Sequence, residues 1–183
     1  CNWGYCNSVV NDQFGSVNKG KGAIYIPAEI SKMYEGKQLS YVRVGLAAKA
    51  KTVKVFVTKD LNGEYIATRT QRDQLSGFNE IKFAEPWTID GEGFYIGYEF
   101  ESDDSALGSS TMYNENGCWA DLGDGWKNYA VEDHALALSI QAKISGDNLP
   151  KDYWLFCSND ILAEAGKPFN INFSIRNMGT AIG

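Results

Sequence analysis

Hydrophobic and polar residues alternate one by one along most of the chain. The alternation is clearest in four segments, residues 39–46, 51–58, 94–101 and 136–144. In the third of these, Phe94, Ile96, Tyr98 and Phe100 fall on one side, opposite Tyr95, Gly97, Glu99 and Glu101. Because successive side chains of a strand point to opposite faces, this pattern predicts strands with one buried face.

The same alternation assigns two faces to the other three segments. In 51–58 it places Val53, Val55 and Val57 inward and Thr52, Lys54 and Thr58 outward. In 39–46 it separates Leu39, Tyr41, Arg43 and Gly45 from Val42, Val44 and Leu46. In 136–144 it separates Leu136, Leu138, Ile140, Ala142 and Ile144 from Ala137, Ser139, Gln141 and Lys143. Weaker strand signals lie at 23–26, 64–70, 79–83 and 87–89.

Two local motifs connect these strands. The Asn62-Gly63 dipeptide prefers a left-handed backbone, which predicts a tight hairpin between the strands on either side. Residues 27–37 form the single helical pattern, which begins at proline, carries Ile30, Met33 and Tyr34 at helical spacing, and ends at Gly36. One short helix is therefore expected.

Short strands that are separated by turns, without alternating helices, indicate an all-β fold of two antiparallel sheets packed face to face. A polar joint at residues 147–151 precedes a fresh alternation at Phe169, Ile171, Phe173 and Ile175. Two strands cannot enclose a core. Either the parent protein continues past Gly183, or these strands extend an existing sheet edge, including that of a neighbouring molecule.

Charge and length exclude several partners. The 183 residues carry a net charge of −6, which repels phosphate backbones and anionic lipid headgroups, so no nucleic acid partner is expected. No apolar run approaches the roughly 20 residues of a membrane-spanning helix, so no membrane insertion is expected either. The sequence shows neither an initiator Met nor a signal-peptide core, which indicates a mature chain or one excised from a longer protein.

The four cysteines are Cys1, Cys6, Cys118 and Cys157, an even number that allows three pairings. Their scattered spacing and the single histidine disfavour a zinc site. Disulfides in an oxidising compartment are favoured slightly over free thiols. A chain that opens on cysteine can be a bacterial lipoprotein; the following NWGYC is typical of a strand, so lipid anchoring is the lesser alternative to an arbitrary starting point.

Catalytic motifs are scarce. His134 precedes a regular strand, and the chain contains no G-x-S-x-G elbow, so a nucleophilic triad is not expected. Glu99 and Glu101 lie on the outward file of their strand, near Asp103 and Asp104. Paired carboxylates could hydrolyse glycosides, which keeps a carboxylate-dependent hydrolase as a minor alternative. The chain is otherwise predicted not to be an enzyme and to need no cofactor.

Aspartates in two connections raise the possibility of a structural calcium ion, which binds six to eight oxygens. The weak candidates are Asp103, Asp104, Asp121 and Asp124. The spacing departs from the EF-hand pattern, so ordinary hydrophilic turns remain the alternative.

Residues 105–130 combine aromatic rings with amides and carboxylates. Flat rings stack on the C–H face of a sugar while polar neighbours bind its hydroxyls, so this segment is a candidate ligand site. The candidate residues are Tyr113, Asn116, Trp119, Trp126 and Tyr129. Alternatively, Trp119 and Trp126 cap the open end of the sandwich, because tryptophan buries a large area wherever it can.

Four stretches carry a family resemblance that spans most of residues 23–147. They are AEISKMYEGKQLSYVRVGL, VKVFVTKDLNGEYIAT, GFNEIKFAEPWTIDGEGFYIGYEF and ALALSIQAKISGD. They resemble the jelly-roll accessory modules found beside streptopain-like cysteine peptidases and in cleaved-adhesin surface proteins. The tail from residue 152, with its RNMGT motif, is similar to the opening strands of immunoglobulin-like adhesion repeats.

The resemblance implies an antiparallel two-sheet jelly-roll-like sandwich over residues 1–147, followed at 148–183 by a linker and an incomplete immunoglobulin-like β unit. It further implies a non-catalytic module of a secreted or cell-surface bacterial protein, joined to neighbouring domains of a longer chain. Together with the aromatic segment, it predicts binding to a glycan or protein surface. A purely structural spacer is the alternative.

Overall fold

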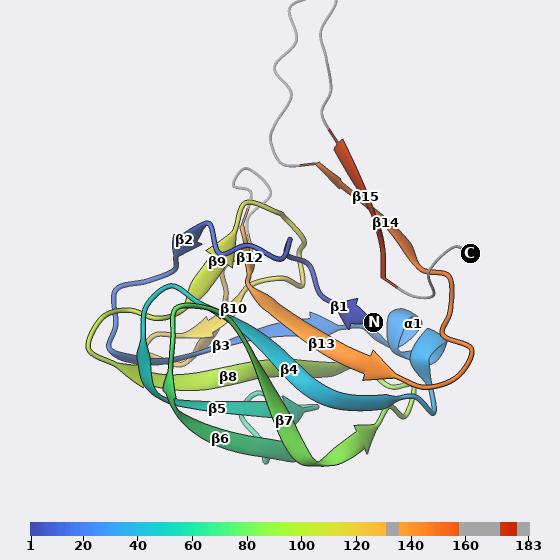
Figure 1. Cartoon of the computed structure of the whole chain (residues 1–183), viewed down its shortest axis with the longest axis horizontal. Coiled ribbons are helices and arrows are strands. Elements are labelled where there is room, and N and C mark those ends of the chain that lie inside the picture. Colours follow the sequence, from blue (N-terminus) through green and yellow to red (C-terminus); the bar gives the residue numbers. More distant parts are fainter. Residues whose placement is uncertain (131–135, 158–172, 179–183) are drawn as a thin grey trace, which may run out of the picture.

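The computed structural model describes residues 1–130, 136–157 and 173–178 (Figure 1). As the alternation predicts, the chain is an all-β sandwich of antiparallel sheets with one short helix. One sheet has four strands in the order β1 (Asn2–Trp3), β13 (Ile140–Ser145), β4 (Gln38–Leu46) and β7 (Gly77–Thr88). The facing sheet has six, in the order β11 (Trp126–Asn128), β10 (Trp119–Asp121), β3 (Lys19–Ile26), β8 (Phe94–Ser102), β5 (Ala50–Thr58) and β6 (Ala67–Gln74).

Two smaller sheets complete the fold. One contains β12 (Ala137–Leu138), β9 (Gly108–Ser110) and β2 (Asp12–Gln13). The other pairs β14 (Tyr153–Cys157) with β15 (Phe173–Asn177). The helical segment forms α1 (Ala28–Ser31) and a following 3₁₀ turn, η1 (Lys32–Tyr34), and Gly36 then adopts a left-handed φ of 78°. The part of the chain that the structure describes contains no helix long and apolar enough to cross a membrane.

The core lies between the two large sheets. The predicted inward file of β8 is buried, as are Val53, Val55 and Val57 of β5. From β4, the side chains of Leu39, Val42, Val44 and Leu46 join them.

The prediction that Leu39 shares a face with Tyr41 is wrong. The pairing of β4 with β7 shifts register between these two residues, and this β-bulge changes the phase of the alternation. As a result, Leu39 is buried together with Val42, although the two are an odd number of residues apart.

Burial on both faces corrects the prediction for 136–144. Ser139 and Gln141 are fully buried, although the alternation places them opposite the core file. The N-terminal segment covers them: β1 pairs with β13, and a Cβ on Gly4 would collide with the Ile140 carbonyl and the Gln141 side chain. The predicted strand also divides into β12 and β13 at Ser139.

The connection between β5 and β6 is wider than the Asn-Gly motif predicts. The two strands pair antiparallel, but their ladder ends at Val57 and Ala67. Gly63 does not adopt a positive φ, and its amide donates to the Asp60 carbonyl at 3.0 Å. The prediction that Thr58 faces solvent is wrong: Thr58 is buried, and its hydroxyl lies within hydrogen-bond distance of the Asp60 and Glu64 carbonyls of this loop.

The weaker strand signals are extended or shifted in the structure. Residues 79–83 and 87–89 belong largely to one continuous strand, β7, and the 64–70 signal is displaced to β6. The 23–26 signal is the end of the longer β3.

The β14–β15 hairpin stands apart from the body of the sandwich, beside α1 and the N-terminus (Figure 1). Asp152, Arg176 and Met178 lie at the end of the hairpin nearest the sandwich, which we call its base, and all three contact the sandwich. Asp152 accepts hydrogen bonds from Trp3 Nε1 at 3.0 Å and from the Tyr34 hydroxyl at 2.9 Å. Met178 is buried in the main core, and Arg176 donates to the carbonyls of residues 2, 4 and 6. Phe169 and Ile171 lie outside the described residues.

Candidate functional site

The outer face of the six-stranded sheet carries rows of polar side chains. Because the inward files of β3, β5 and β8 fill the core, the alternate residues of these strands face away from it. Register then sets the rows: Lys21 is opposite Glu99, which is opposite Lys54, and Lys54 is opposite Thr70 of β6. We call Lys21, Glu99 and Lys54 the charged row.

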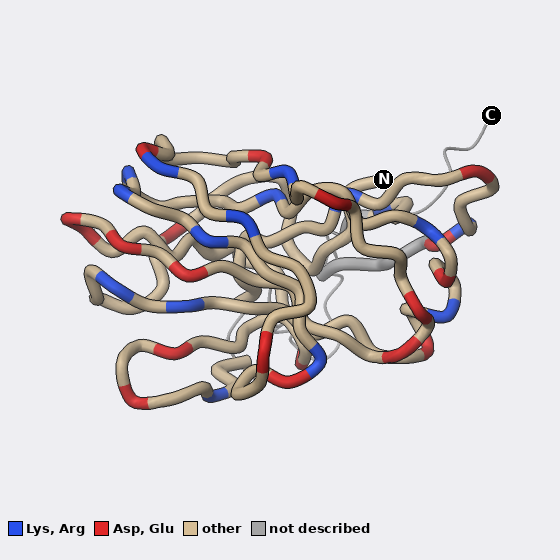
Figure 2. Tube along the Cα trace, turned by 90° about the horizontal axis from the view of Figure 1, so that it is seen from below, with Lys and Arg blue, Asp and Glu red and all other residues tan. Residues whose placement is uncertain are grey.

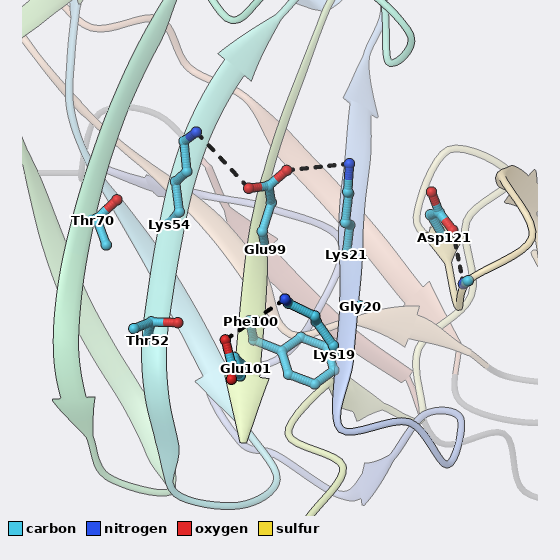
Figure 3. A pocket seen from close by; sticks show the side chains of 11 residues that line it. Lys19, Gly20, Lys21, Thr52, Lys54, Thr70, Glu99, Phe100, Glu101 and Asp121 are labelled. Carbon is cyan, nitrogen blue, oxygen red and sulfur yellow. Dashed lines mark hydrogen bonds and ion pairs between the residues drawn. The ribbon is translucent and has the colours of Figure 1, made fainter. Parts of the chain in front are cut away.

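The Glu99 carboxylate is the centre of the charged row (Figure 3). Lys21 Nζ lies 3.2 Å from Glu99 Oε1, and Lys54 Nζ lies 4.0 Å from Oε2. The Tyr65 hydroxyl also donates to Oε1, at 2.8 Å. Burial and the adjacent Glu99 raise the pKa of the Tyr65 phenol, which therefore remains a donor at neutral pH.

A neighbouring row repeats this arrangement closer to the end of the sheet. Lys19 Nζ lies 3.9 Å from Glu101 Oε2, and Thr52 of β5 is in register with Glu101. The two rows border a hollow of about 700 Å³ against the outer face (Figure 3). Its lining residues are Lys19, Gly20, Lys21, Thr52, Lys54, Thr70, Glu99, Phe100, Glu101, Asp121 and Gly123.

Asp121 holds the loop that forms one rim of this hollow. Its Oδ1 accepts hydrogen bonds from the amides of Gly123, at 2.9 Å, and Gly125, at 3.1 Å. Both glycines have positive φ, 115° and 96°, which residues with a side chain adopt only with strain. The DLGDG sequence thus fixes the backbone beside the hollow.

An aromatic cluster adjoins the charged row on the same face. We define it as Phe56, Tyr65, Tyr95, Trp119 and Trp126, which pack with Ala23 and Leu61. The Phe56 and Tyr65 rings are stacked, with centroids 4.3 Å apart, and Trp126 meets Phe56 edge-on at 6.2 Å. Trp119 meets Tyr95 edge-on at 5.8 Å. The two tryptophans are half-buried, and the indole Nε1 of Trp119 is buried.

The structure brings together two of the five predicted ligand residues, Trp119 and Trp126. Tyr129 instead packs edge-on against Phe14, with centroids 5.1 Å apart, and joins the main core. Asn116 instead ties its loop to β3, because its backbone carbonyl accepts a hydrogen bond from the Tyr25 amide at 2.9 Å.

Tyr113 is half-buried in the same connection and is not part of the aromatic cluster. The tryptophans lie over the sheet face, whereas the hypothesis of capping places them at the open end of the sandwich. Sequence reasoning missed the charged row, although the outward file of β8 contains Glu99 and Glu101.

The calcium candidates are dispersed. Asp103 pairs with Lys51 at 2.8 Å and Asp124 with Lys127 at 2.5 Å. Among residues 1–130, 136–157 and 173–178, no three aspartate, glutamate, histidine or cysteine side chains gather as a metal would require. His134 lies outside these ranges.

Cys1, Cys6 and Cys118 are free thiols, so none of them forms the disulfide favoured from sequence. Burial raises the pKa of Cys6 to about 11 and that of Cys118 to about 12, which leaves both thiols protonated at neutral pH.

Acidic and basic positions are interspersed along the described trace (Figure 2). No known family model matches the chain, and no curated protein matches its sequence. The outer face of the six-stranded sheet, with its hollow and its aromatic cluster, is the candidate functional surface.

Proposed function

We propose that this chain is a non-catalytic accessory module of a secreted or cell-surface bacterial protein, and that it binds a glycan through the outer face of its six-stranded sheet. The observation that carries this proposal is the hollow of about 700 Å³ over the two rows of polar side chains. Its size is within the range of about 300 to 1,000 Å³ typical of ligand sites.

The chemistry of this face suits sugars. Ammonium, carboxylate and hydroxyl groups line the hollow, and all of them bind sugar hydroxyls. The aromatic cluster lies next to them, joined through the hydrogen bond from Tyr65 to Glu99. Its half-buried tryptophans offer a platform for the C–H face of a pyranose. The resemblance to accessory modules of exported proteins supports the same role.

Binding and fluorescence measurements on a panel of soluble polysaccharides test the proposal. We expect saturable binding to at least one polysaccharide, with a change in tryptophan fluorescence. Trp126→Ala should weaken it roughly tenfold, equivalent to about 1.4 kcal/mol, because Trp126 is half-buried in the aromatic cluster. Tyr41→Ala is the matched control, since Tyr41 is half-buried on β4 of the other sheet.

Turnover assays test the hydrolase alternative, and a panel of protein ligands tests binding to a protein surface. Hydrolysis of glycosides that Glu101→Gln abolishes would establish the carboxylate-dependent hydrolase instead. Binding to a protein ligand, with no polysaccharide bound, would assign the face to a protein surface.

A structural spacer is the second candidate function, and the base of the β14–β15 hairpin favours it. Asp152 joins this base to Trp3 and Tyr34, while Arg176 and Met178 attach β15 and its end to the sandwich. Such a junction would hold a neighbouring domain at a fixed angle. If no polysaccharide and no protein ligand bound, the result would support the spacer and contradict the glycan-binding proposal.

A further inference from the structure

We propose that the hollow selects a neutral polysaccharide, whose hydroxyl groups insert between Lys54 and Glu99 and between Lys19 and Glu101. This inference rests on the proposed function, because it concerns the same face, and it adds the chemical class of the ligand.

The charges that line the hollow balance one another. The hollow is lined by three ammonium groups, from Lys19, Lys21 and Lys54, and by three carboxylates, from Glu99, Glu101 and Asp121. In the two rows opposite charges are neighbours, since Glu99 lies between two lysines and Glu101 faces a third.

A charged ligand would be repelled by one of the two side chains in each lysine–glutamate pair. A ligand carboxylate placed on Lys54 would lie close to Glu99 and be repelled by it. A ligand ammonium placed on Glu99 would meet Lys21 and Lys54. The net charge of −6 adds long-range repulsion against acidic polymers. A neutral ligand avoids both penalties.

Two of the lysine–glutamate pairs are separated by gaps wide enough to admit a hydroxyl group. Lys54 Nζ and Glu99 Oε2 are 4.0 Å apart, and Lys19 Nζ and Glu101 Oε2 are 3.9 Å apart. Both separations exceed hydrogen-bond length, so each pair presents a donor and an acceptor that do not satisfy each other. We call them the two open pairs.

A hydroxyl group fits an open pair because it donates and accepts at once. An oxygen about 2.8 Å from each partner forms the apex of a triangle whose base is the gap, with the hydroxyl proton directed to the carboxylate and an ammonium proton directed to the hydroxyl oxygen. Glu99 and Glu101 are two residues apart on β8, or about 7 Å. One open pair lies between β8 and β5 and the other between β8 and β3, so the two pairs are arranged diagonally across β8. A chain of hydroxyl-bearing sugars that crosses this strand obliquely would reach both.

Thr52 and Thr70 extend the same recognition. Thr70 is in register with Lys54, and Thr52 with Glu101, so one hydroxyl lies beside each open pair. Both threonines line the hollow and add neutral donors and acceptors without changing its charge.

Isothermal titration calorimetry with three kinds of probe tests the inference: neutral polysaccharides (a β-glucan, a xylan and a mannan), polygalacturonate as the acidic probe, and chitosan as the basic one. We expect a neutral polymer to bind, with an affinity that changes less than about twofold between roughly 50 and 200 mM salt, because no counterions are released. Polygalacturonate and chitosan should bind at least about tenfold more weakly.

Two near-isosteric variants address the Lys54 open pair. Lys54→Met and Glu99→Gln should each weaken neutral binding about tenfold. Lys127→Met is the control for the first, because Lys127 pairs with Asp124 outside the lining of the hollow. Glu80→Gln is the control for the second, because Glu80 pairs with Arg43 and Lys143 on the other sheet. Thermal melting of every variant establishes that it folds.

Each outcome separates this inference from the proposed function. Preferential, steeply salt-dependent binding of polygalacturonate or chitosan overturns the inference and leaves a glycan-binding module. Neutral binding that Trp126→Ala weakens, but that Lys54→Met and Glu99→Gln leave unchanged, also overturns the inference alone. Absence of binding to every polysaccharide overturns both.

Discussion

Gly97 allows a direct test of how the aromatic cluster lies on the sheet. This glycine of β8 is in register with Ala23 of β3 on one side and with Phe56 of β5 on the other. A Cβ added at Gly97 would lie 2.8 Å from both Ala23 Cβ and Phe56 Cζ and would collide with the Gly22 carbonyl oxygen. Since Gly97 does not have a positive φ, the effect of Gly97→Ala is steric.

The magnitude follows from this geometry. Overpacking of a well-packed site destabilises a protein by about 1 to 3 kcal/mol, and here a strand backbone must move as well as a ring. For a chain of this size, such a loss lowers Tm by about 2 to 12 °C. In urea denaturation, the midpoint should fall while the slope of unfolding free energy against urea stays constant.

Gly63→Ala is the control for Gly97→Ala. Gly63 lies in an exposed turn, where the nearest atom to an added Cβ is Asp60 Cβ at 3.2 Å. The free energy of unfolding of Gly63→Ala should therefore stay within about 0.5 kcal/mol of wild type. A Gly97→Ala variant with the same midpoint as wild type would refute the described packing of Phe56 over β8.

Two further predictions concern buried polar groups. Tyr34→Phe removes a buried hydrogen bond to the Asp152 carboxylate and should destabilise the protein by about 1.5 to 3 kcal/mol in urea denaturation; an unchanged midpoint would contradict the described junction. Cys6 and Cys118 should react with Ellman's reagent at pH 8 only after unfolding, because burial raises their pKa to about 11 and about 12. The unfolded thiols ionise first, so these groups stabilise the fold below about pH 9, and the stabilisation falls above it by about 1.4 kcal/mol per pH unit and thiol. Fast reaction of the native thiols, or stability that rises in this range, would contradict the burial.

Local alternation predicted the long core strands and most of their faces, but not the short strands β2, β9, β10 and β11. The file Phe94, Ile96, Tyr98 and Phe100 is buried as expected, because β8 pairs along its length without a bulge against β3. The predicted faces were wrong where segments distant in the sequence pack against the strand. The bulge after Leu39 depends on the pairing with β7, and the burial of Gln141 depends on the N-terminal segment. The alternation within one strand does not reveal that β7 or the N-terminal segment will pack against it.

The candidate site was predicted only in part, for the same reason. Trp119 and Trp126 stand out in the sequence as large aromatic residues within a polar segment. The charged row does not, because Lys21, Glu99 and Lys54 come from three strands that only antiparallel register aligns. Each of these residues resembles an ordinary exposed position until the order of the strands is known.

Amide chemical-shift mapping during titration with a neutral polysaccharide tests the central claim most directly. The account predicts that the shifts concentrate in β3, β5 and β8 around the charged row, and in the loop at residues 121–125. The four-stranded sheet should remain unperturbed. Shifts confined to β4 and β13, or a spectrum that no polysaccharide changes, would contradict it.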